Sequence, residues 1–131
     1  MSTLDLHHLG LAVQDLETTT AFFCAVLGFS VVKEKPDYPA TFISNGHILL
    51  TLWQTEAAAA PFDRRRAVGL HHFALRVESE SELNAVYRNA MAWPGVVSDF
   101  EPEPLGESGA RHAMLFEPGG IRLELICLTS P

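Results

Sequence analysis

The octapeptide LHHLGLAV at residues 6–13 returns as LHHFALRV at residues 70–77, shifted by 64 positions. Self-similarity at a fixed offset indicates a repeated structural unit. Within each copy the apolar residues alternate with other side chains, which is typical of a β-strand with one buried face. We therefore interpret the chain as a duplication whose copies each begin with a strand.

A helical segment follows each copy of the octapeptide. In the first copy Asp15 is a candidate N-cap and Gly28 ends the helix. In the second copy Ser79 and Glu82 form a capping box, and Pro94-Gly95 stops the helix. Apolar positions at helical spacing lie between these signals; in the first copy they include Leu16, Thr20, Phe23 and Leu27.

Turn residues after each helix predict hairpins. Asn45-Gly46 separates strands at 40–44 and 47–54, and residues 117–120 (EPGG) separate strands at 111–116 and 121–128. Each half is therefore predicted to be βαβββ. We expect a single domain, 1–131, with module one at about 4–54, a linker at about 55–68 and module two at about 69–128. Residues 101–109, rich in Pro and Gly, are expected to be a mobile loop.

Composition excludes several function classes. A chain of 131 residues with 47% hydrophobic residues can bury one core. The formal charge of −7 argues against nucleic-acid partners. No apolar run approaches the roughly 18 residues of a membrane span, and residues 1–5 lack the features of a secretory signal, so a cytoplasmic protein is expected. Cys24 and Cys127 are interpreted as reduced core residues.

Strand alternation places three candidate metal ligands on faces turned away from the helices. His8 shares such a face with Gly10 and Ala12, His72 lies on the corresponding face of the second copy, and Glu124 lies among Leu and Ile residues of the last strand. A buried carboxylate without a partner is costly. Either Glu124 and the two histidines bind a metal, or Glu124 pairs with an arginine in a metal-free site; the candidate partners are Arg76 and Arg122.

The other histidines are given no ligand role by this reasoning. His7 and His71 are expected at the rim, on the helix side of their strands. His47 and His112 are hairpin residues that we expect to contact solvent or substrate instead of metal.

The run HLGLAVQD from His8, then Phe22-Phe23 and Leu27-Gly28-Phe29, and finally FEPGGIRLE at 116–124 resemble the vicinal oxygen chelate superfamily. That superfamily comprises glyoxalase I, methylmalonyl-CoA epimerase, extradiol dioxygenases, fosfomycin-resistance enzymes and bleomycin-resistance proteins. The resemblance covers almost the whole chain. It implies an α+β fold in which two βαβββ modules form a curved eight-stranded mixed sheet with helices on the convex face.

The resemblance also implies a site. The family's ligand positions match His8, His72 and Glu124, and a metal-bound Glu124 can serve as the general base. Two His nitrogens with one carboxylate suit Zn, Mn, Ni, Co or Fe(II). This chain has Thr51 where many glyoxalases have a fourth ligand, a Glu. It has Met114 where fosfomycin-resistance enzymes have a Tyr. We expect substrate contacts at Thr51, Trp53, Arg76, Arg122 and Met114.

The function expected from this resemblance is that of a glyoxalase-like metalloenzyme, of the lyase, isomerase or dioxygenase type. It would act on a small oxygen-rich metabolite that chelates the divalent metal through two oxygens. Small members of the superfamily usually form homodimers, which we expect here also. The alternative is a non-catalytic small-molecule binding protein of the bleomycin-resistance type.

Overall fold

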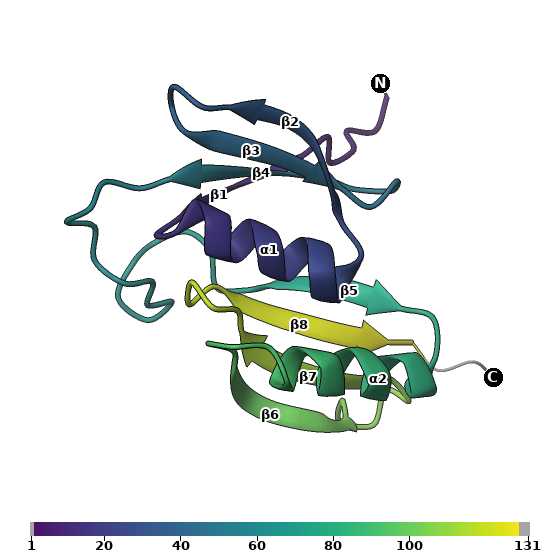
Figure 1. Ribbon diagram of the computed structural model, residues 1–131. Coiled ribbons are helices and arrows are strands. Elements are labelled where there is room, and N and C mark those ends of the chain that lie inside the picture. The colour runs from purple at the N-terminus through teal and green to yellow at the C-terminus, as the bar shows by residue number, and fades with distance from the viewer. Residues whose placement is uncertain (1, 129–131) are drawn as a thin grey trace. The chain divides into compact units, whose positions relative to one another are not determined.

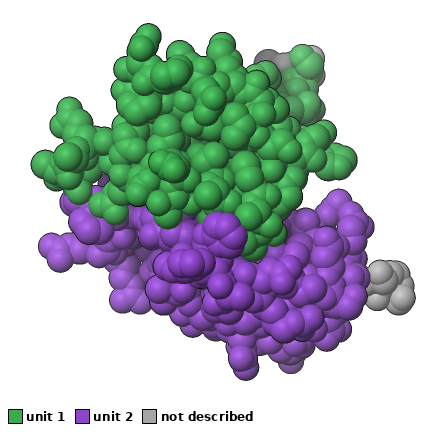
Figure 2. All heavy atoms as spheres, viewed as in Figure 1, with its two compact units in different colours: residues 1–59 green, residues 60–131 purple. Residues whose placement is uncertain are grey.

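The computed structural model describes residues 2–128, and the chain divides into two compact units, residues 1–59 and 60–131 (Figure 2). Both units have the element order strand, helix and three strands, labelled in Figure 1. The described strands form two four-stranded mixed sheets, one in each unit. The predicted α+β class and the two βαβββ modules are therefore confirmed. No helix within residues 2–128 is long and apolar enough to cross a membrane.

The first unit pairs its strands in the order β1-β4-β3-β2, and only the β1–β4 pair is parallel. Its elements are β1 (Leu9–Val13), α1 (Leu16–Leu27), β2 (Ser30–Lys35), β3 (Ala40–Ser44) and β4 (Leu49–Gln54). The parallel pair needs a long crossover, and α1 with the β2–β3 hairpin supplies it. The register sets Gly10 beside Thr51 and Ala12 beside Trp53.

Strand alternation in the first unit separates a buried face from an open one. Leu11 and Val13 are buried, whereas Gly10 and Ala12 between and beside them are exposed. The helix α1 covers the buried face with Phe22 and Phe23, both fully buried. The buried residues of the helix are Thr19, Phe22 and Phe23. Of the four residues predicted to face the core, only Phe23 is fully buried. The buried face of the helix is centred about one residue before the predicted one.

Both predicted N-caps are confirmed. The Asp15 carboxylate accepts a hydrogen bond from the Thr18 amide at 3.1 Å, and the Ser79 hydroxyl accepts one from the Glu82 amide at 3.1 Å. The first helix also ends at Gly28, as predicted, in the left-handed conformation with φ 76°. A single capping residue, Asp15 or Ser79, therefore marks where each helix begins.

The first hairpin is longer than the Asn45-Gly46 signal predicts. The strand β4 begins at Leu49 instead of residue 47. The Asn45 side-chain oxygen accepts hydrogen bonds from the amides of His47 and Ile48, both at 2.9 Å. These two amides are satisfied by the Asn side chain and are not available to the ladder, so the turn takes in residues 45–48.

The second unit repeats the topology with the strand order β5-β8-β7-β6. Its elements are β5 (Phe73–Val77), α2 (Glu80–Met91), β6 (Val97–Pro104), β7 (Arg111–Phe116) and β8 (Arg122–Cys127). The β5–β8 pair is parallel and sets Ala74 beside Glu124. The central strand β8 is buried along almost its whole length, so the Glu124 carboxylate is largely shielded from water.

The prediction of a mobile loop at 101–109 is wrong for its first four residues. Residues 101–104 belong to β6, which pairs antiparallel with β7 through shifts of register on either side of Phe100. The strand β6 lies at the edge of its sheet, where a proline needs no hydrogen-bonding neighbour on its outer side. Pro102 and Pro104 are therefore compatible with a strand here.

Both cysteines are free thiols, as the sequence predicts. Cys127 is buried in β8, and Cys24 is half-buried on α1, where burial raises the pKa of its thiol.

Candidate metal centre

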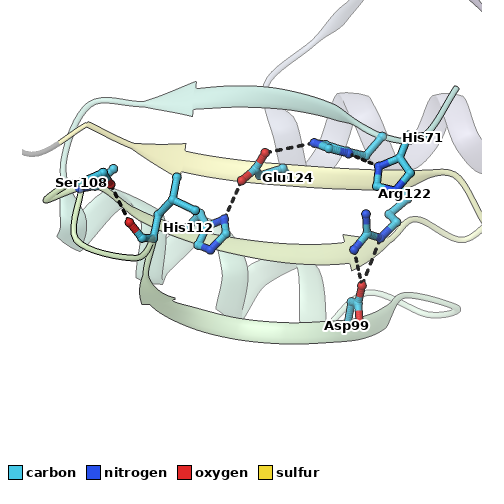
Figure 3. A network of polar contacts seen from close by, with 9 residues as sticks. His71, Asp99, Ser108, His112, Arg122 and Glu124 are labelled. Carbon is cyan, nitrogen blue, oxygen red and sulfur yellow. Dashed lines mark hydrogen bonds and ion pairs between the residues drawn. The ribbon is translucent and has the colours of Figure 1, made fainter.

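The parallel pairing of β5 with β8 brings His72 and Glu124 together in the second unit. His72 directly precedes β5, and its Nε2 lies 3.3 Å from Oε1 of Glu124. The Glu124 side chain is 11% exposed and that of His72 is 31% exposed. Figure 3 shows Glu124 extending from the centre of its sheet with polar contacts on two sides. Two of the three predicted metal ligands are thus neighbours.

This pair fits two ligands of one divalent ion. Imidazole nitrogen and carboxylate oxygen bind such ions at about 2.1 Å, so two of them at neighbouring coordination positions lie about 3 Å apart. The observed 3.3 Å is close to that separation. Imidazole nitrogen and carboxylate oxygen are donors that suit Zn, Mn, Ni, Co and Fe(II). Within residues 2–128, however, no group of three His, Cys, Asp or Glu side chains is assembled as a metal site.

His112 on β7 contacts the second oxygen of the same carboxylate. Its Nδ1 lies 2.6 Å from Oε2 of Glu124, and both side chains are close to nine-tenths buried. The ring also packs against Phe100, with centroids 4.8 Å apart and an angle of 61° between the planes. Glu124 is therefore contacted by a different histidine on each oxygen (Figure 3).

His71 contacts the other ring nitrogen of His72. The two Nδ1 atoms are 2.7 Å apart, so one ring donates and the other accepts. Partial desolvation, with the positive charges of His72, Arg122 and Arg64, lowers the pKa of His71. In the tautomer in which Nδ1 of His72 donates to Nδ1 of His71, Nε2 of His72 is a lone pair directed toward Glu124. The sequence prediction that His71 has no ligand role stays a prediction, but the residue is a direct neighbour of a candidate ligand.

The first unit contains the same histidine pair at the corresponding positions. Nδ1 of His7 lies 2.8 Å from Nδ1 of His8, and the rings meet edge to face. Both residues are exposed and precede β1. The duplication thus preserves the arrangement of side chains as well as the order of elements, and His8 is the counterpart of His72.

Thr51, at the position where the sequence departs from the glyoxalase pattern, has a partner within its own strand. The Trp53 indole Nε1–H donates to the Thr51 hydroxyl at 2.8 Å. Gly10 on the neighbouring strand leaves the room for this contact, because a Cβ there would lie 3.1 Å from the hydroxyl oxygen and 3.5 Å from the indole nitrogen. Thr51 is 2% exposed, so its hydroxyl is enclosed by these neighbours.

Trp53 lines a pocket of about 400 Å³ within the first unit, together with Ala12, Tyr38, Gln54, Thr55, Glu56, Ala58 and Ala59. The Tyr38 ring meets the Trp53 indole edge to face, with 4.6 Å between the ring centroids. The Phe42 ring is tilted against the same indole, with 5.8 Å between the centroids. The ammonium group of Lys35 lies 5.5 Å from the indole ring. An aromatic wall beside a cation suits a flat or partly apolar small molecule.

The remaining predicted substrate residues differ in their availability. Arg122 is 8% exposed, and its guanidinium donates from Nε at 3.1 Å and from an η nitrogen at 2.8 Å to one Asp99 oxygen. Met114 is buried and pairs with Glu124 across β7 and β8. Arg76 is exposed on β5. Glu124 is paired with two histidines, and its contacts include neither Arg76 nor Arg122.

His112 is the site residue that the sequence reasoning placed only in contact with solvent or substrate. A signal for it exists in the register of the hairpin. The strand β7 pairs with β8 so that Met114 lies opposite Glu124 and His112 lies opposite Ile126. His112, Met114 and Glu124 therefore share one face of the sheet, and a long side chain reaches its diagonal neighbour. The EPGG turn and two-residue alternation together would have predicted the contact.

The chain is similar to known proteins both in sequence and in fold. The model of the Glyoxalase/Bleomycin resistance protein/Dioxygenase superfamily matches residues 5–125. A catechol-2,3-dioxygenase of Bacillus subtilis is 33% identical over 79 residues, which is 58% of this chain but only 27% of the relative. A trivalent organoarsenical cleaving enzyme of Bacillus sp. is 31% identical over 94 residues, 72% of this chain and 53% of the relative.

Among solved structures, the fosfomycin resistance protein FosX of Listeria monocytogenes superposes with a TM-score of 0.76, covering 98% of this chain and 96% of FosX. The identity is 18%, so this similarity shows the fold alone. The chain spans about half or less of the length of the two curated enzymes that it matches here.

Proposed function

The chain belongs to the Glyoxalase/Bleomycin resistance protein/Dioxygenase superfamily, and we propose that it is a metal-dependent enzyme acting on a small oxygen-rich metabolite. His72 and Glu124 are two of the proposed ligands, and His8 is the third, because the repeat makes it the counterpart of His72. A bound divalent ion would supply Lewis-acid polarisation of a substrate oxygen. The metal of choice is one of Zn, Mn, Ni, Co and Fe(II).

The observation that supports this proposal is the 3.3 Å between His72 Nε2 and Glu124 Oε1. The carboxylate is about nine-tenths buried on the central strand, where an anion needs compensation. A metal ion provides that compensation and also explains why a second histidine, His71, contacts the far nitrogen of the ring.

Three protein ligands leave room on an octahedral ion for two substrate oxygens, which is the basis for proposing bidentate chelation. Glu124 is also the proposed proton acceptor, because it is the one carboxylate among the proposed ligands. Trp53 and its aromatic neighbours offer an apolar wall. Thr51 is proposed to act through its contact with Trp53, Arg76 as an exposed cation, and Met114 and Arg122 as buried support.

The alternative function is that of a binding protein without turnover. The pocket lined by Trp53 and Tyr38 favours it, because two aromatic rings can hold a flat ligand without any metal. The two functions, catalysis of the lyase, isomerase or dioxygenase type and binding without turnover, therefore require different residues. Only catalysis requires His72 and Glu124.

Turnover assays with metal-loaded protein distinguish the two functions. The panel consists of α-ketoaldehyde hemithioacetals, catechols and fosfomycin, and each compound is assayed for product and for binding. The proposed enzyme converts at least one class and loses that activity in Glu124→Gln. Binding of a panel member to the parent and to Glu124→Gln with equal affinity and no product would favour the binding protein.

We also propose that the protein is a homodimer, as small members of this superfamily usually are. Two copies would allow His8 to come from either chain of the dimer. Light scattering at micromolar concentration tests the assembly, and a monomeric mass would exclude the dimer.

A further inference from the structure

We propose that His112 is a positioning residue that holds Glu124 as a one-oxygen ligand. Its Nδ1–H donates to Oε2, so that Oε1 is the oxygen favoured to bind an ion beside His72. This inference rests on the proposed metal site and adds to it a fourth residue, which acts through Glu124 and not on the ion itself.

The contact has the geometry of a strong hydrogen bond. The 2.6 Å between Nδ1 and Oε2 is slightly shorter than the roughly 2.7 to 2.9 Å that is usual for a charge-assisted N–H···O bond. The side chains of His112 and Glu124 are 12% and 11% exposed, so little water competes for either atom. As a metal ligand the Glu124 carboxylate has no proton to donate, so the donor is Nδ1 of His112.

The neighbours of His112 hold its ring in the donating orientation. His112 lies on the same face of β7 as Met114, the direct partner of Glu124 across the sheet. Phe100 of β6 packs against the imidazole with 4.8 Å between centroids. A ring held by an aromatic neighbour and by the sheet loses little further freedom when it donates, so the bond can determine the plane of the carboxylate.

The division of the two carboxylate oxygens carries the chemical consequence. Oε1 lies 3.3 Å from Nε2 of His72, and Oε2 lies 2.6 Å from Nδ1 of His112, so each carboxylate oxygen has its own histidine. A hydrogen bond to one carboxylate oxygen weakens that oxygen as a ligand and so favours binding of an ion through the other oxygen, which leaves one more coordination position for substrate oxygens. His112 therefore serves bidentate binding of the substrate by disfavouring bidentate binding of Glu124.

Four variants test this role. His112→Asn places an amide donor near the position of Nδ1, whereas His112→Gln moves the same amide one bond further out. His112→Phe keeps the ring that packs against Phe100 but has no donor. His47→Phe makes the same replacement at an exposed turn residue and serves as the control. Circular dichroism and thermal unfolding establish that each variant is folded, and the Asn and Gln pair decides the question if the Phe variant does not fold.

The first measurement is titration of each protein with Co²⁺, followed by visible absorption. We expect His112→Phe and His112→Gln to bind about 10 to 100-fold more weakly than the parent, with a changed absorption spectrum, because the carboxylate is no longer oriented. His112→Asn should stay within a few fold of the parent and keep its spectrum. Affinities of His112→Phe and His112→Gln equal to that of the parent would overturn the proposal.

The second measurement uses metal-free protein and is independent of activity. Nitrogen-15 NMR of the imidazoles should show the proton of His112 on Nδ1, and Glu124→Gln should shift that proton signal. A proton on Nε2 of His112 would overturn the proposal even if Co²⁺ binds. A parent protein that binds no Co²⁺ would instead overturn the proposed function, and the role of His112 with it, so the two failures are distinguishable.

Discussion

Trp53 donates its indole N–H to the Thr51 hydroxyl at 2.8 Å, from two positions further along the same strand. Thr51 is the residue that stands where many glyoxalases have a fourth ligand. Its oxygen is already an acceptor for Trp53 and faces the backbone of Gly10. We therefore expect the side chain to support the face of β4 and not to join the proposed ligands.

A first prediction follows for Thr51. Thr51→Ala should preserve metal affinity within a few fold, because a neutral hydroxyl is a weak ligand, but it should change the fluorescence of Trp53, whose N–H loses its acceptor. Thr51→Glu should tighten metal binding by adding a carboxylate. Metal titration and emission spectra provide the readouts, with Trp53→Phe used to subtract the signal of Trp93. Loss of metal in Thr51→Ala as complete as in His8→Ala would make Thr51 a ligand.

A second prediction concerns His71, whose Nδ1 lies 2.7 Å from that of His72. His71→Ala should weaken metal binding by about tenfold, since it removes the acceptor that sets the tautomer of His72. His71→Asn, which can place an oxygen acceptor near Nδ1, should recover most of the affinity. Isothermal titration calorimetry compares them, and equal affinities for the parent and the Ala variant would count against a role for His71.

A third prediction separates the two arginines that the sequence assigned to the substrate. Asp99→Ala should lower the free energy of unfolding by about 2 kcal/mol, because it leaves the buried Arg122 guanidinium without its partner. Arg122→Met should cost only about 1 kcal/mol, since the remaining Asp99 is partly hydrated. Arg76→Met, at an exposed position, should stay within about 0.5 kcal/mol of the parent. Urea denaturation measures all three, and equal losses in the two Arg variants would contradict this view of Arg122.

The fold was predictable because its signals are local and repeated. The signals are the octapeptide, Asp15, Ser79 and Gly28, and each affects the structure only of residues close to it in the sequence. The structure confirms the two N-caps, Asp15 and Ser79. Residues 101–104 were not predictable in this way. Pro102 disfavours a strand locally, and only the edge position of β6, a property of the whole sheet, makes the strand acceptable.

The candidate site was predictable in part for the same reason. The alternation of side chains along a strand places His72 and Glu124 on faces turned away from the helices. The parallel pairing of β5 with β8 then brings Nε2 of His72 to 3.3 Å from Oε1 of Glu124. His112 and Asp99 were missed because their roles depend on diagonal and cross-strand neighbours, which need a register that alternation alone does not specify.

A fourth prediction uses the N-cap of α1. The hydrogen bond from the Thr18 amide lowers the pKa of Asp15 below its ordinary value of 3.8. The carboxylate therefore contributes stability that is full above pH 3.8 and is lost as the pH falls through the lower, folded pKa. Asp15→Ala should lower the free energy of unfolding by about 1 kcal/mol at neutral pH.

Asp15→Asn is the matched control, because it keeps a capping oxygen but has no charge to titrate. It should retain most of the neutral-pH stability and lack the contribution that the parent loses at acid pH. Thermal unfolding between pH 2 and pH 7 provides the comparison. Identical acid profiles for the parent and Asp15→Asn would show that the cap does not depend on ionisation.

The metal content of purified protein tests the central claim most directly. The parent and the variants His8→Ala, His72→Ala and Glu124→Ala are incubated with one divalent ion, desalted and measured by mass spectrometry of the metal, with His47→Ala as the control. We predict about one ion per chain in the parent and the control, and strong loss in the other three, because two ligands do not hold an ion as three do. Near-stoichiometric metal in His72→Ala would contradict the account.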